Sequence, residues 1–99
     1  MPLYATIIPT FLEFTTSTCP ACKYMEPTIE EAKIKFKGKA NVVVVNLDLQ
    51  ENAHLAMAYN VRVVPTLVFL DNDAVIKSRT EGVTTLDDIE KMLKEAGMQ

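Results

Sequence analysis

Two cysteines, the only ones in this 99-residue chain, stand in the sequence Cys19-Pro20-Ala21-Cys22. An apolar, β-prone run over residues 10–15 precedes them and a helical pattern follows, so the pair is predicted to lie at a helix N-terminus. The unpaired N–H groups and the positive dipole end of a helix stabilise a thiolate there. The second cysteine, one helical turn away, can close a small disulfide loop. Because the thiolate is the nucleophile of disulfide exchange, this spacing predicts two-electron transfer between dithiols.

Metal binding is the other common use of a cysteine pair. A structural zinc site normally takes four ligands. The chain offers two cysteines and one histidine, His54, which is distant in sequence. We therefore favour redox chemistry, expect no metal, and interpret His54 as an exposed helix residue.

The composition bounds the class of protein. With 48% hydrophobic and 23% charged residues, residues 1–99 are predicted to form a single domain. The net charge of −3 and the absence of a basic cluster argue against a nucleic-acid partner. No apolar run approaches the roughly 20 residues of a membrane span. The first residues lack the features of a signal peptide, which favours a cytoplasmic protein. A trimmed mature chain would look the same, so an extracytoplasmic location stays open.

Strand patterns occur at four places. Residues 10–15 form the first, and the run Val42–Val45 predicts a strand that is buried on both faces. Residues 66–70 form another strand, residues 71–73 a tight turn, and residues 74–80 the returning partner of a hairpin.

Three helices are predicted between and after these strands. From Lys23 to Lys37, apolar residues recur at three- and four-residue steps and indicate an amphipathic helix, with Pro27 inside it and Gly38 as its C-terminal cap. Residues 51–59 predict a short helix capped by Asp48 or Gln50. The last helix covers residues 86–96, with Thr85 as N-cap and Asp88 as the acid of a capping box. The order of elements implies a mixed sheet with helices on both faces.

These features together resemble the thioredoxin family, from about residue 10 to the C-terminus. The cysteine pair ends a strand and opens a helix, and Pro27 stands five residues past the second cysteine, as in that family. The segment Tyr59–Leu67, with its Val64-Pro65-Thr66, and Gly82 after the last strand also match. The resemblance implies an α/β fold, a thioredoxin-like three-layer sandwich with a central mixed four-stranded sheet flanked by helices. The first strand and helix of full thioredoxins are missing here or reduced to a short fifth strand near residues 3–8.

The resemblance also implies roles for the residues around the cysteines. Cys19 would attack a target disulfide, and Cys22 would resolve the mixed disulfide. Pro20 suits the first helical position, and Lys23 is either a help to the thiolate or a solvated residue. Thr18 stands where the family carries a tryptophan, which predicts a more open groove.

Glu13 occupies the position of the buried acid of the family. Burial would raise the pKa of this carboxyl toward neutrality, so that it could take the proton of Cys22. Strand periodicity alone would instead point Glu13 outward. The lysine that thioredoxins place beside this acid aligns here with Val44 or Val45.

A substrate groove is the last site that the resemblance implies. Val64-Pro65 resembles the cis-proline loop, which would face the cysteines, and the Val64 backbone would pair with an extended substrate segment. The substrate-binding residues implied in this way are Thr18, Val64, Pro65, Gly82 and Val83.

The leading prediction is therefore a thioredoxin-like disulfide reductase. It would act on disulfide-containing proteins as a monomer, without a bound cofactor, and be recharged by an electron donor of the thioredoxin-reductase type. Two alternatives stay open. One is an extracytoplasmic thiol oxidant or isomerase domain, and the other is a non-catalytic thioredoxin-like module that binds proteins.

Overall fold

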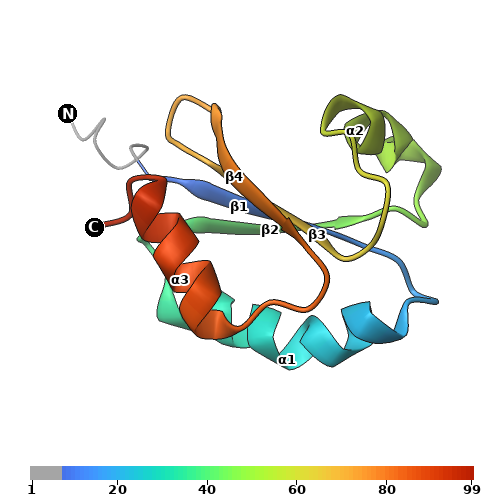
Figure 1. The fold of residues 1–99 in the computed structure, drawn as a ribbon, viewed down its shortest axis with the longest axis horizontal. Helices are drawn as coiled ribbons and strands as arrows, with labels where there is room; N and C mark the ends of the chain where they lie inside the picture. Colours follow the sequence, from blue (N-terminus) through green and yellow to red (C-terminus); the bar gives the residue numbers. More distant parts are fainter. Residues whose placement is uncertain (1–7) are drawn as a thin grey trace.

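The computed structural model describes residues 8–99. A mixed four-stranded sheet forms its centre, with the strand order β2-β1-β3-β4 (Figure 1). Strands β1 and β2 run parallel, whereas β3 is antiparallel to both β1 and β4. The strands are β1 (Thr10–Thr15), β2 (Asn41–Asn46), β3 (Thr66–Leu70) and β4 (Ile76–Glu81). The predicted sheet is confirmed, and the possible fifth strand near residues 3–8 lies, except for Ile8, outside the described residues.

Helices cover both faces of this sheet and complete the three layers. The long helix α1 (Pro20–Lys35) and the last helix α3 (Leu86–Glu95) lie on one face, and α2 (Ala53–Ala58) lies on the other (Figure 1). A single 3-10 turn, η2 (Gln50–Asn52), leads into α2. The three-layer sandwich predicted from the resemblance is therefore confirmed.

Two apolar cores separate the layers, because successive strand residues point to opposite faces. Phe11 and Phe69 stack with ring centroids 5.0 Å apart in the larger core, between the sheet and helices α1 and α3. Phe14 and Val68 lie in the smaller core on the α2 side, where Tyr59 packs against Phe14. Glu13, two residues after Phe11, also points to the α1 side, and strand alternation does not expose it because helices cover both faces of the sheet.

The prediction that Val42–Val45 is buried on both faces is wrong. Strand β2 lies at the edge of the sheet, and Val43 and Val44 are each 41% exposed, whereas Val45 is 5% exposed. Four consecutive valines indicate a strand because branched side chains fit a pleated surface, but they do not specify its place in the sheet.

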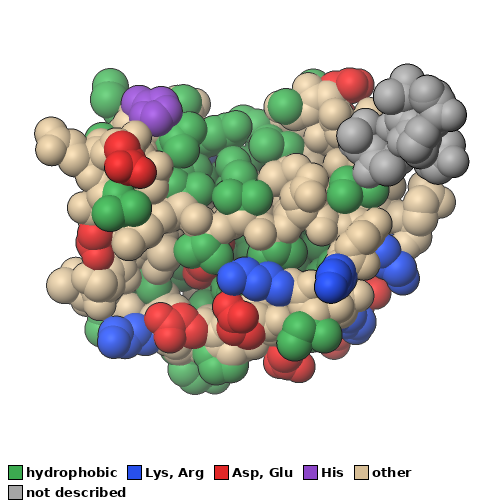
Figure 2. All heavy atoms as spheres, turned by 180° about the vertical axis from the view of Figure 1, so that it is seen from behind, with side chains coloured by type: hydrophobic (Ala, Val, Ile, Leu, Met, Phe, Trp, Pro, Cys, Tyr) green, Lys and Arg blue, Asp and Glu red, His purple; other side chains and the backbone are tan. Residues whose placement is uncertain are grey.

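From behind, hydrophobic side chains gather across the middle of the molecule, above a border of charged side chains (Figure 2).

Several predicted ends of elements also need correction. Helix α1 begins at Pro20, as predicted for this proline, and not near Lys23, where helical periodicity placed its start; Cys19 serves as its N-cap. Its C-terminal cap is Phe36, so Gly38 is not the cap and instead takes a positive φ of 79° in the turn that follows. Glycine adopts this left-handed conformation at little cost.

The region predicted as one helix over residues 51–59 is divided between η2 and α2. Neither of these helices has a side-chain cap, so the predicted caps Asp48 and Gln50 are wrong. Asp48 instead accepts a hydrogen bond of 2.9 Å from the Ser17 N–H. The returning strand begins at Ile76, two residues later than predicted.

The last helix begins at Leu86 as predicted but ends at Glu95, one residue early, and among the described residues no hydrogen bond to the Asp88 side chain completes the predicted capping box. Thr85 is the N-cap, and its hydroxyl accepts a hydrogen bond of 3.2 Å from the Asp88 N–H. None of the helices within residues 8–99 is both long and apolar enough to cross a membrane.

Candidate functional site

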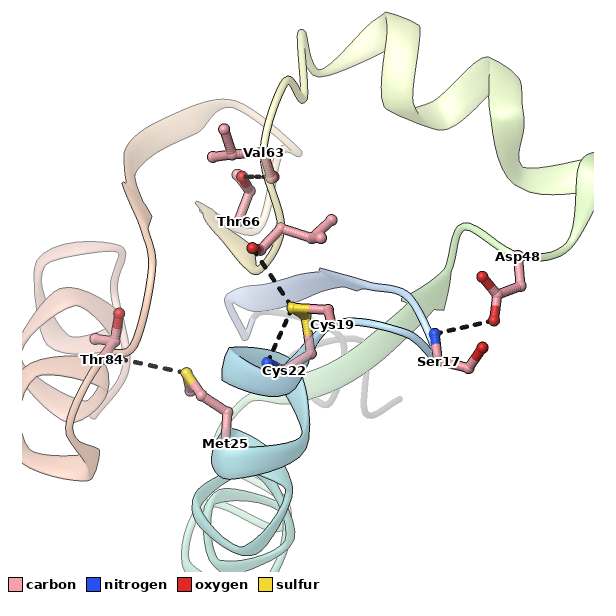
Figure 3. Close-up of a disulfide and its surroundings, with 9 residues drawn as sticks. Ser17, Cys19, Cys22, Met25, Asp48, Val63, Thr66 and Thr84 are labelled. Carbon is pink, nitrogen blue, oxygen red and sulfur yellow. Dashed lines mark hydrogen bonds between the residues drawn. A yellow bond between two sulfur atoms is a disulfide. The ribbon is translucent and has the colours of Figure 1, made fainter.

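The two cysteines form a disulfide at the N-terminus of α1, with Cα atoms 5.2 Å apart (Figure 3). Cys19 is partly exposed, whereas Cys22 is only 2% exposed. A partner can therefore reach the sulfur of Cys19 but not that of Cys22. This asymmetry separates the two thiols chemically.

The start of the helix supplies a hydrogen-bond donor to the exposed sulfur. The Cys22 N–H donates to Cys19 Sγ over 3.1 Å, which makes Cys19 the N-cap of α1. Pro20 follows at the first helical position, where no N–H is needed. In the reduced protein, the same N–H and the helix dipole would favour the thiolate of Cys19.

A second loop approaches Cys19 from the start of β3. The Val64-Pro65 peptide bond is cis, so the predicted cis-proline is confirmed. The sulfur of Cys19 lies 3.6 Å from the Val64 carbonyl oxygen. On the other side of this loop, the Gly82 N–H donates to the Pro65 carbonyl over 2.8 Å.

Exposed side chains border this arrangement. Thr18 is exposed next to Cys19, and Val83 is 52% exposed next to Gly82. Val63, which the sequence analysis did not single out, is 48% exposed and precedes the cis-proline loop. The residues predicted for the groove therefore lie on three segments, two of which are joined by the bond from Gly82 to Pro65.

Glu13 lies under the active-site helix, beside the buried cysteine. It is 4% exposed and borders a cavity of about 310 Å³ between β1, β2 and α1. The cavity is also lined by Cys22, Glu26, Glu30, Lys33 and Val44. The pKa of the Glu13 carboxyl is raised to about 7, mainly by burial and also by the charge of Glu26, while the charge of Lys33 opposes the rise.

The strand register decides which residue stands beside this acid. Glu13 pairs with Val44, which borders the cavity, whereas Val45 pairs with Phe14 and belongs to the core of the opposite face. An apolar side chain therefore occupies the strand position next to Glu13. The charges near the acid come from α1 instead, through Glu26 and Lys33, which the sequence analysis did not single out.

Two further polar residues named in the sequence analysis have exposed side chains. His54 is exposed on α2, and Lys23 is exposed on α1. Among residues 8–99, no cluster of three or more histidine, cysteine, aspartate or glutamate side chains could hold a metal ion. Chemically, the site combines an accessible sulfur, a buried sulfur and a buried carboxyl with a pKa near neutrality.

Comparison with known proteins agrees with this geometry. The thioredoxin family model matches residues 5–95. Thioredoxin H5 of Arabidopsis thaliana is 32% identical over 87 residues, which cover 88% of this chain and 70% of that protein. A thioredoxin of Buchnera aphidicola is 30% identical over 77% of this chain and 68% of its own length. The mitochondrial thioredoxin of Bos taurus is 31% identical, and the match covers 51% of it.

Solved structures give the same result for the fold. An uncharacterised thioredoxin-like protein from Clostridium perfringens superposes with a TM-score of 0.82 at 33% identity, over 92% of this chain and 72% of that one. A malarial protein superposes with a TM-score of 0.80 at 21% identity, over 92% and 99% of the two chains, and this match concerns the fold alone.

Proposed function

The chain belongs to the thioredoxin family and is a thiol–disulfide oxidoreductase, and on this basis we propose that it reduces disulfide bonds in proteins. Cys19 is the attacking thiol and Cys22 the resolving thiol in this proposal. The observation that carries the assignment is the difference in burial between the two cysteine residues. The N–H of Cys22, directed at the exposed sulfur, supports it.

The first step is the attack of the Cys19 thiolate on one sulfur of the target disulfide. A bond forms between Cys19 Sγ and that sulfur, the target disulfide breaks, and the other target sulfur leaves as a thiolate that takes a proton from water. The helix N-terminus, with Pro20 at its first position, stabilises the attacking thiolate.

The second step needs a base, because Cys22 is buried and must lose its proton before it attacks. Glu13 borders the same cavity, which is large enough to hold water, and its carboxylate accepts this proton. The Cys22 sulfur then bonds to Cys19 Sγ, the mixed disulfide breaks, and the second target thiolate leaves. Two electrons have passed to the target, and Cys19 and Cys22 end as a disulfide.

Substrate binding is assigned to the surface around Cys19. The Val64 backbone, next to Pro65, pairs with an extended segment of the target, as peptides often add to an exposed backbone edge. Thr18, Gly82 and Val83 border this segment, and the small side chain of Thr18 leaves the groove open.

The wider setting of the reaction is part of the same proposal. Residues 1–99 act as a single, monomeric, cytoplasmic domain that holds no cofactor of its own. A partner of the thioredoxin-reductase type returns the disulfide to the dithiol. An extracytoplasmic oxidant or isomerase would use the same site in the opposite direction, and a binding module would use the groove without exchange.

Trapping the mixed disulfide tests the assignment of the two cysteines. We expect reduced Cys22→Ser to form a stable covalent adduct with a disulfide-containing protein such as insulin, because the resolving thiol is absent. Cys19→Ser is the matched control and should form far less adduct, since its remaining thiol is buried. The measurement is intact mass after quenching with an alkylating reagent. Equal adducts from both variants would contradict the assignment, and no exchange by the wild type would leave only the binding module.

A further inference from the structure

A buried hydrogen bond joins the active-site helix to the loop that follows β4. The Thr84 N–H donates to the Met25 sulfur over 3.3 Å (Figure 3). Met25 is fully buried and lies three residues after Cys22 on α1, so both side chains lie on the same side of the helix. Thr84 is 6% exposed and ends the segment that contains Gly82 and Val83.

This segment is held at both of its ends. Its first residue, Gly82, donates its N–H to the Pro65 carbonyl, and its last, Thr84, donates to Met25. The Thr84 hydroxyl also donates to the Gly82 carbonyl over 3.1 Å, so a hydrogen bond connects the two ends of the segment directly. Only the middle residue, Val83, presents its side chain to solvent, with 52% exposure.

This hydrogen bond needs the methionine sulfur as its acceptor. A thioether is a weak acceptor, but leucine or isoleucine at the same place would offer none. The Thr84 N–H is buried, so water does not easily replace the sulfur as its partner. An unpaired buried N–H is disfavoured, and the segment would have to move to satisfy it.

We propose that Met25 is a positioning residue, whose sulfur holds the Gly82–Thr84 segment in the place where it binds the backbone of a protein substrate. The inference rests on the proposed function, because it assumes that this segment borders the substrate groove. Met25 touches no reacting atom in this proposal. Its effect should therefore fall on the binding of extended protein substrates rather than on the exchange chemistry of Cys19.

The test compares Met25→Leu with Met92→Leu, using a protein disulfide and a small one. Met92 is a partly buried methionine that packs against the same core but has no part in the site. For Met25→Leu we expect kcat/KM with insulin to fall about tenfold, mostly through KM. The rate with a small aromatic disulfide, which needs no groove, should stay within about twofold of the wild type, as should both rates of Met92→Leu.

Amide exchange in the wild type gives a second test, which does not depend on how the variants fold. The Thr84 amide should exchange at least about tenfold more slowly than the neighbouring Val83 amide, because a hydrogen bond in a buried place protects it. Equal exchange at Thr84 and Val83 would overturn the proposal. So would a Met25→Leu variant that slows both substrates equally or neither. A wild type that reduces neither substrate would instead refute the proposed function.

Discussion

Glu13 makes the stability of the protein depend on pH in a direction that an ordinary surface glutamate would not. Its pKa is about 7 in the folded chain, against 4.5 as the ordinary value. A raised pKa means that folding favours the protonated form. The stability linked to this group is therefore fully present below about pH 4.5 and is lost as the pH rises through about 7.

We expect Glu13→Gln to remove this loss, because a neutral amide cannot ionise. Between pH 4.5 and pH 8, the stability of the variant relative to the wild type should rise by up to about 3 kcal/mol. Urea unfolding of the oxidised proteins at several pH values measures this difference, and the disulfide keeps the cysteines from titrating. A difference that does not change with pH would show that Glu13 ionises as a solvated residue does.

Glu26 and Lys33 should move the pKa of Glu13 in opposite directions. Both border its cavity, where the Glu26 charge raises that pKa and the Lys33 charge lowers it. We expect Glu26→Gln to lower the Glu13 pKa and Lys33→Gln to raise it. Lys33 also forms an ion pair of 3.0 Å with Glu30, so its replacement additionally frees a nearby carboxylate, which acts in the same direction.

Carboxyl carbon titration by NMR, in the oxidised protein, follows Glu13 directly. Glu31→Gln is the matched control, since Glu31 is also exposed on α1 but does not border the cavity. It should leave the Glu13 pKa nearly unchanged. Shifts of the same sign for Glu26→Gln and Lys33→Gln would mean that these charges do not act on Glu13 through the cavity.

At the scale of elements, the register between β1 and β2 determines which residue can act on the acid from the sheet. Glu13 pairs with Val44, and neighbouring strand positions point to opposite faces. We expect Val44→Lys to place an ammonium group beside Glu13 and to lower its pKa by about one unit or more. Val43→Lys is the control, because Val43 is equally exposed but faces the other side of the sheet. The same NMR titration measures the Glu13 pKa in both variants. Similar changes of this pKa in Val44→Lys and Val43→Lys would contradict the strand register.

The kinds and order of the helices and strands were predictable from the sequence. The solvent exposure of individual strands and the exact helix ends were less so. The pattern Phe11, Met25, Ile29 and Leu93 identifies residues of one core, because burial imposes helical or alternating periodicity. The exposure of Val43 depends on which strand lies at the edge of the sheet, and a run of valines does not contain that information. Helix α1 starts at Pro20 because the sulfur of Cys19 caps it. Helical periodicity of apolar residues cannot predict a cap of this kind.

The parts of the site that belong to a sequence motif were predictable. The residues that join it only through their proximity in the folded structure were not. The cysteine pair and Val64-Pro65 were visible as motifs, and the burial of Glu13 was expected from the resemblance rather than from periodicity. Glu26 and Lys33 look like the solvated face of an amphipathic helix, and only the three-dimensional cavity connects them to the acid. Met25 looks like a core residue, and its bond to Thr84 spans 59 positions.

At the scale of the whole molecule, the fold brings the candidate site together from four stretches of chain. Helix α1 brings the cysteines, the loop before β3 brings Val64 and Pro65, and the loop after β4 brings Gly82. Strand β1 carries Glu13 beneath them, next to the buried sulfur. In the proposed mechanism, the sulfur of Cys19 meets the substrate, and Glu13 accepts the proton of Cys22 from the cavity beneath the helix.

The direction of electron transfer is a property of this whole arrangement and is measured by the reduction potential of the Cys19–Cys22 couple. Raising a two-electron potential from roughly −270 mV, typical of thioredoxin, to roughly −180 mV, typical of a disulfide isomerase, requires about 4 kcal/mol of extra stabilisation of the dithiol form. A hydrogen bond to a charged group contributes about 1.5–3 kcal/mol. In the described part of the chain, the structure places one such donor on Cys19 Sγ, the N–H of Cys22.

One such hydrogen bond is less than the roughly 4 kcal/mol required, so we expect a potential below roughly −180 mV, on the reductase side of this range. Equilibration in thiol–disulfide buffers, followed by alkylation and mass measurement of the free thiols, gives this number. A potential above roughly −180 mV would assign the chain to the oxidants or isomerases, because the dithiol form would then be stabilised beyond what this one hydrogen bond provides. Thiols that never form a reversible disulfide would leave the groove as a binding surface, without the exchange that the burial of Cys22 beside Glu13 otherwise supports.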